Sequence, residues 1–149
     1  MAPVFRYLLR VRYGECDAQK VVFNSRYGDY VDLAVTEYFR ALGYGEQLAS
    51  GELDYQLVKQ LTEWRAPARF DQVLEIGVRC ARLGTTSFAL GCEFRIAGTD
   101  GRAIASSETV YVLVDHLTLA KRTLPEGLRA RMIQGTDAVT DHAAFRGAA

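Results

Sequence analysis

The sequence predicts an α+β protein in which an antiparallel β-sheet of about five strands wraps around one long central helix. Three observations predict it: one amphipathic helical stretch near the N-terminus, strand-like alternation before and after it, and short glycine-containing turns between the later strands. A single helix with a long apolar stripe needs a sheet to cover it. The length suits a single domain over residues 1–149, and we expect its core over residues 5–134.

The first strand is expected over residues 7–13, where polar and apolar residues alternate. The helix is expected over residues 25–42, because apolar residues recur there at steps of three and four. The side chain of Asn24 or Ser25 can accept a hydrogen bond from the first turn, and Gly43 suits a left-handed helix end.

Four further strands are expected after the helix, and short hairpins make them an antiparallel meander. Their expected ranges are residues 55–64, 73–82, 87–96 and 104–114. Pro125 is expected to open a short C-terminal helix. The small and polar residues 135–149 are expected to be loosely ordered.

The composition excludes several classes of protein. Lys plus Arg and Asp plus Glu both number 18, which argues against the broad basic field of a nucleic-acid binder. No run approaches 18 apolar residues and no secretion signal opens the chain, so we expect a cytoplasmic protein that does not enter a membrane. The three cysteines match neither a zinc site nor a disulfide framework, and no phosphate loop or dinucleotide motif is present. No metal or cofactor is therefore expected.

The most informative stretch is residues 13–27, YGECDAQKVVFNSRY. It places the carboxylate of Asp17 in the loop just ahead of the helix, whose first turn offers free N–H groups and a positive dipole end. Hydrolysis of a thioester needs donors that polarise the carbonyl and a base or nucleophile that delivers oxygen to its carbon. This stretch can supply both.

The same stretch resembles the motif of the 4-hydroxybenzoyl-CoA thioesterase family, the single hotdog-domain acyl-CoA thioesterases, which reads roughly Asp-x-Asp-x-x-Gly-x-Val and continues into a helix that carries a Tyr. Residues 64–71 and 82–87 resemble the family's Pro-x-x-Tyr/Phe-Asp turn and its Gly-x-x-Ser hairpin. Together the resemblance covers about residues 8–114. It implies the hotdog fold and hydrolysis of an acyl-CoA to a free carboxylate and CoA.

The resemblance also implies roles for particular residues. Asp17 is the expected base or nucleophile, Asn24 acts through its backbone N–H, and Tyr27 is the first aromatic residue of the helix. The family pairs two sheets edge to edge and joins residues of both subunits in each active site, so we expect a homotetramer built as a dimer of dimers. The expected contacts to the acyl-CoA substrate are Lys20, Val58, Lys59, Arg82, Thr85, Thr86 and Ser87.

Two residues depart from the family pattern. Glu15 replaces the first aspartate, and Lys20 stands where many members have glycine. Only glycine adopts positive φ freely, so either the loop follows a different path or Lys20 places a charge near a carboxylated or phosphate-bearing part of the substrate. Two other functions stay open: a non-catalytic acyl-CoA binding or sensing module, and a hotdog hydratase or dehydratase. The latter typically pairs a carboxylate with a histidine, and no histidine precedes His116.

Overall fold

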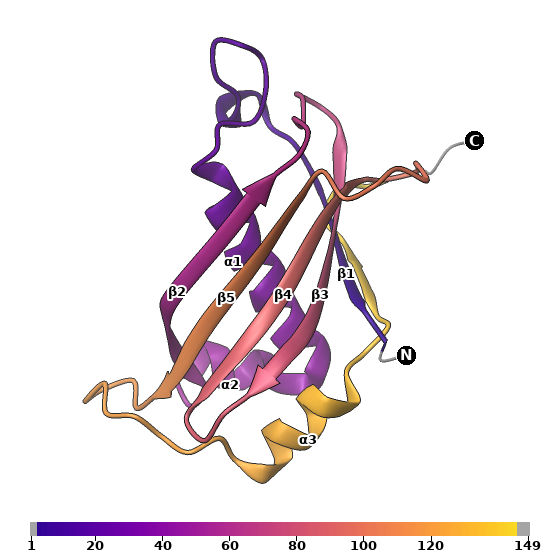
Figure 1. The fold of residues 1–149 in the computed structure, drawn as a ribbon. Helices are drawn as coiled ribbons and strands as arrows, with labels where there is room; N and C mark the ends of the chain where they lie inside the picture. Colours follow the sequence, from indigo (N-terminus) through magenta and orange to yellow (C-terminus); the bar gives the residue numbers. More distant parts are fainter. Residues whose placement is uncertain (1–2, 146–149) are drawn as a thin grey trace.

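The computed structural model describes residues 3–145 and shows a six-stranded sheet curved around one long helix (Figure 1). Its strands lie in the order β2-β5-β4-β3-β1-β6. All neighbours are antiparallel except β1 and β6, which are parallel. This arrangement confirms the α+β class. The elements are β1 (Phe5–Arg10), α1 (Arg26–Phe39), α2 (Gly45–Ser50), β2 (Asp54–Trp64), β3 (Val73–Leu83), β4 (Ser87–Ile96), β5 (Ala105–Val114), α3 (Glu126–Gln134) and β6 (Val139–Asp141).

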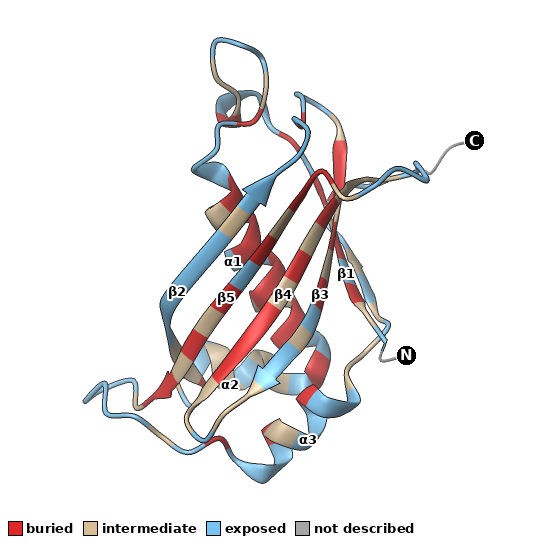
Figure 2. Ribbon diagram, in the orientation of Figure 1, coloured by how far each residue is buried: buried red, intermediate tan, exposed pale blue. Residues whose placement is uncertain are grey.

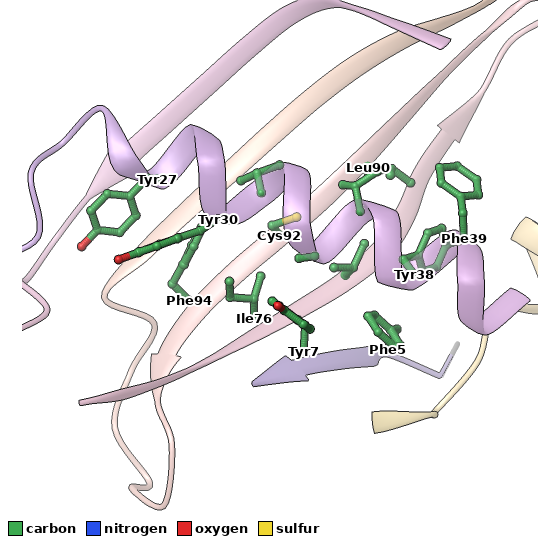
Figure 3. Packing of buried hydrophobic residues seen from close by; sticks show 14 of the residues in the cluster. Phe5, Tyr7, Tyr27, Tyr30, Tyr38, Phe39, Ile76, Leu90, Cys92 and Phe94 are labelled. Carbon is green, nitrogen blue, oxygen red and sulfur yellow. The ribbon is translucent and has the colours of Figure 1, made fainter. Parts of the chain in front are cut away.

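Helix α1 is the centre of the core. Its apolar stripe faces the inner side of the sheet, where alternate residues of β1, β3, β4 and β5 are buried (Figures 2 and 3). Aromatic rings make much of the contact: Tyr27 packs against Phe94, and Phe39 against Phe88, with ring centroids 5.2 and 5.6 Å apart. Full burial of one such side chain contributes roughly 1.5–3 kcal/mol, so this layer fixes where the helix lies.

The helical segment differs from its expected form at both ends. No side-chain hydrogen bond caps α1; instead the carbonyls of Phe23 and Asn24 accept from the N–H groups of Arg26 and Tyr27, at 2.9 and 3.3 Å. Gly43 has φ 98°, as its predicted left-handed conformation requires, but the chain then continues into α2, which sequence reasoning missed. Within residues 3–145, no helix combines the length and the apolar character needed to span a bilayer.

The first strand begins and ends earlier than expected. It covers Phe5–Arg10, and the chain then forms a 3₁₀ turn over Tyr13–Glu15. The turn interrupts the alternation, so Tyr13, which was expected on the buried face, is 81% exposed.

The C-terminal tail is more ordered than expected up to residue 145. Residues Val139–Asp141 form β6, which pairs with β1 along the edge of the sheet. The hydroxyl of Tyr7 and Nδ1 of His142 share a hydrogen bond of 2.8 Å, and the N–H of His142 donates to the carbonyl of Leu8 at 2.9 Å. The polar composition of the tail did not predict this order, because the hydrogen-bond partners of the tail lie on the edge of β1.

Strand β2 forms the opposite edge of the sheet and is exposed along most of its length (Figure 2). It carries four large apolar side chains that are about half exposed: Leu57, Val58, Leu61 and Trp64. A β-bulge between Leu57 and Lys59 interrupts its pairing with β5. An edge that combines free backbone groups with apolar side chains is suited to pairing with another chain.

The tail provides a test of the fold. We expect truncation after Thr136 to lower the free energy of unfolding by roughly 2 kcal/mol, since it removes the hydrogen bonds between β6 and β1, each worth about 0.5–1.5 kcal/mol. Urea unfolding measures the change, with a chain that ends at Phe145 and keeps β6 as the control. Equal stability of the two truncated chains would contradict the role given to β6.

Candidate active site

The loop that carries Asp17 is a tight hairpin. The N–H of Asp17 donates to the carbonyl of Val21, and the N–H of Lys20 donates to the carbonyl of Asp17, both at 2.9 Å. One carboxylate oxygen of Asp17 accepts the N–H of Gln19 at 2.8 Å. This pattern is a turn followed by one residue in the left-handed conformation, and it holds the half-buried carboxylate in a defined position.

Lys20 occupies the left-handed position of this hairpin, with φ 65°. The loop therefore keeps the backbone conformation that favours glycine at this position. The alternative that the loop follows a different path is excluded. For a residue with a side chain, this conformation costs roughly 1–2 kcal/mol. The side chain of Lys20 is exposed, so its charge is available to a ligand.

Glu15 is a buried carboxylate beside this loop, with 6% of its surface exposed. One oxygen accepts the backbone N–H of Arg12 and the hydroxyl of Tyr30, both at 2.8 Å. The other accepts Nε and Nη2 of Arg12 at 2.9 and 2.6 Å. Burial acts to raise the pKa of Glu15, but the hydrogen bonds from Arg12 and Tyr30 outweigh it and lower the pKa below its ordinary value. The carboxylate is therefore charged, and both of its oxygens accept hydrogen bonds.

The backbone of Glu15 also reaches the start of the helix. Its carbonyl accepts the N–H of Phe23 at 3.0 Å, and the N–H of Val22 donates to the carbonyl of Ala68 at 2.8 Å. These bonds fix the chain immediately before Asn24. Across residues 3–145, the N–H groups of Asn24 and Ser25 have no protein acceptor, so both are free to bind a ligand oxygen.

An open hollow of about 430 Å³ lies between this end of α1 and the free edge strand β2. Gly28, in the first turn of α1, makes room for it: a Cβ at this position would lie 3.3 Å from Nε2 of Gln60. Sequence reasoning missed the part contributed by β2, although a glycine inside a helical pattern is a signal of close approach. The residues that line the hollow are Asn24, Ser25, Gly28, Gln60, Leu61, Thr62 and Trp64.

The structure places the three expected catalytic residues at the same end of α1, but not on one surface. Asn24 lines the hollow, whereas Asp17 lies in the hairpin at this end of the helix (Figure 1) and is not part of the lining. Tyr27 is only 2% exposed, and its ring packs against that of Trp64 at 6.0 Å, beneath the hollow.

A cysteine nucleophile is disfavoured at this end of α1. Burial raises the pKa of the Cys16 thiol, and the nearby carboxylates of Glu15 and Asp17 raise it further. Because the thiolate is the reactive form of cysteine, Asp17 stays the stronger candidate.

The expected substrate contacts other than Lys20 lie elsewhere in the chain. Val58 and Lys59 are exposed on the edge strand β2. Arg82 and the β3–β4 hairpin with Thr85, Thr86 and Ser87 lie beside α3, at the opposite end of the sheet from the start of α1 (Figure 1). A single chain therefore does not bring this hairpin together with Asp17.

A single long helix wrapped by a curved, mainly antiparallel sheet is the arrangement of the hotdog fold. The sequence profile described as "Thioesterase-like superfamily" matches residues 11–132. The acyl-CoA thioester hydrolase YbgC of Escherichia coli O6:H1 is 31% identical over 132 residues, which span 88% of this chain and 97% of that protein.

Solved structures agree with this match. A gentisyl-coenzyme A thioesterase superposes with a TM-score of 0.74 at 25% identity, over 86% of this chain and 98% of the other. A protein from Pseudomonas aeruginosa reaches a TM-score of 0.80 at 26% identity, over 93% and 99%. The chain belongs to the thioesterase-like superfamily, and the hotdog fold and the class of thioester hydrolase expected from its sequence are confirmed.

Replacement of Lys20 separates backbone strain from charge. We expect Lys20→Gly to raise the free energy of unfolding by about 0.5–1 kcal/mol, because relief of the left-handed strain exceeds the extra entropy that glycine gives the unfolded chain. Lys20→Ala removes the charge but keeps the strain, and its stability should stay at or below that of the wild type. Chemical denaturation of the three proteins checks this. A glycine variant that is less stable than the alanine variant would contradict the assignment of strain.

Proposed function

We propose that this protein hydrolyses acyl-CoA thioesters to a free carboxylate and CoA, with Asp17 as base or nucleophile. The observation that carries the proposal is the pair of backbone N–H groups without a protein acceptor at Asn24 and Ser25, two residues that line a hollow at the positive end of α1. The relatives named for acyl-CoA and gentisyl-coenzyme A substrates support the choice of a CoA ester. Three free cysteines suit a reducing compartment, and we place the activity in the cytoplasm.

The two halves of the site have separate tasks in the reaction. The N–H groups of Asn24 and Ser25 stabilise the oxyanion that develops on the thioester carbonyl, and one such donor contributes about 10²–10³ in rate. Asp17 either attacks the carbonyl carbon or removes a proton from an attacking water. Direct attack expels CoA as thiolate and forms an anhydride that water then hydrolyses; the general-base route releases CoA thiolate and the carboxylate without a covalent intermediate.

We further propose that two copies pair along β2 and complete the site, and that two such dimers form the tetramer. The exposed apolar side chains of this edge, Leu57 and Val58 among them, support such pairing. A two-fold axis across the edge reverses the direction of the second copy. Its β3–β4 hairpin then lies at the end where α1 of the first copy begins. Arg82, Thr85, Thr86 and Ser87 of the partner subunit would therefore approach the CoA bound at Asp17, with Val58, Lys59 and Lys20 nearer the acyl thioester.

The catalytic role of Asp17 is tested by thiol release. We expect the wild-type protein to hydrolyse members of a panel of short, medium, long and aromatic acyl-CoAs, and Asp17→Asn to lower kcat by about 10²–10⁴, the range for loss of a general base. Asp100→Asn, in the exposed β4–β5 loop, is the matched control. No hydrolysis of any ester by the wild type would refute the function, while full activity of Asp17→Asn would refute only the site.

Pairing along β2 is tested by the size of the assembly. We expect the wild type to be a dimer or larger by light scattering, and Leu57→Asp to be a folded monomer whose kcat falls at least about tenfold, because each site then lacks its second half. Leu119→Asp is the control, since Leu119 is similarly exposed (53% against 45%) but lies in the turn after β5 and not on β2 itself. An active monomer would contradict the shared site.

A further inference from the structure

We propose that Glu15 is a positioning residue that sets the distance and orientation between the Asp17 carboxylate and the oxyanion donors of α1. This inference rests on the function proposed above and adds to it a residue that does not touch the substrate. Glu15 stands two residues before Asp17 in the chain, and its own atoms accept hydrogen bonds from Tyr30 of α1 and from Phe23, the residue before Asn24.

One set of bonds joins Glu15 to the helix. Its carboxylate accepts the hydroxyl of Tyr30, one turn into α1, at 2.8 Å, and its backbone carbonyl accepts the N–H of Phe23 at 3.0 Å. Phe23 is the residue directly before Asn24. A shift of Glu15 therefore moves the first donor of the helix and the hairpin of Asp17 relative to each other.

A second set of bonds holds Glu15 itself in place. Three bonds from Arg12, one from its backbone and two from its guanidinium, occupy the remaining positions on the carboxylate at 2.6–2.9 Å. Hydrogen bonds to an ionised group are shorter and stronger than neutral ones, so they restrict the movement of the side chain. The guanidinium is itself exposed, with 73% of the Arg12 side chain open to solvent.

Stability alone is a weak reason for this arrangement. Burial of the Glu15 carboxylate costs solvation free energy, and an ion pair often does no more than offset this cost. The same helix also tolerates a buried hydroxyl without a bond: Tyr38 is 1% exposed, and its hydroxyl has no partner within residues 3–145. Precision at the site is the stronger reason, because a misplacement of about 1 Å can lower a rate by about 10².

Two conservative substitutions test this inference. Tyr30→Phe removes only the hydroxyl that reaches Glu15, and Glu15→Gln keeps the shape of the side chain but removes its charge. We expect each to lower kcat for acyl-CoA hydrolysis by about 10- to 100-fold while KM changes less than about threefold, since the site is misaligned but still binds substrate. Tyr38→Phe, which removes the unbonded hydroxyl from the same helix, should keep kcat within about twofold. All assays are run well below the measured unfolding temperature of each variant.

A double mutant separates positioning from two unrelated effects. If Glu15 and Tyr30 act as one unit, Glu15→Gln with Tyr30→Phe lowers kcat no further than Glu15→Gln alone. Wild-type kcat in Tyr30→Phe, which retains the carboxylate and its bonds to Arg12 and is expected to fold, would overturn the inference, as would multiplicative losses in the double mutant. These outcomes are distinct from failure of the proposed function, in which the wild type itself releases no thiol.

Discussion

The buried carboxylate of Glu15 is the constraint on which the geometry of the candidate site depends. Strand β1 leads into a 3₁₀ turn, the hairpin of Asp17 follows, and α1 begins soon afterwards, so three changes of direction occur within about twenty residues. Regular secondary structure does not hold such a segment together. Glu15 does so by accepting bonds from Arg12 before the hairpin and from Phe23 and Tyr30 after it. The aromatic layer beneath α1 then fixes the helix against the sheet.

The chain also leaves part of its site open. The hollow at the start of α1 is bounded on one side by the free edge of β2, and Asp17 is not among the residues that line it. The proposed pairing of two copies across β2 would account for both the apolar side chains along that edge and the remote position of the β3–β4 hairpin. In that arrangement the strand edge that would otherwise be an aggregation hazard becomes a wall of the active site.

The sequence predicted the parts of the fold that repeat a local pattern. The strands β3 to β5 and the apolar stripe of α1 follow from alternation and helical spacing, and the hairpin turns follow from glycine. Strand β2 was expected from a less regular segment. Strand β6 could not be predicted from a local pattern, because a strand of three residues in parallel pairing has no local signature and depends on the edge of β1. The position of Asp17 and Asn24 at one end of the helix was predictable from their order in the chain. The contribution of Gln60 and Thr62 was not, since it depends on where β2 crosses the first turn of α1.

The central claim is that an acyl-CoA thioester is held with its carbonyl oxygen on the helix N-terminus and its carbonyl carbon facing Asp17. A crystal structure with an unhydrolysable analogue, in which a methylene group separates sulfur from the carbonyl, tests it most directly. The account predicts the carbonyl oxygen within about 3 Å of the backbone nitrogen of Asn24, with the carboxylate of Asp17 from the same chain facing the carbon. An analogue bound with its carbonyl directed away from the start of α1 would contradict it.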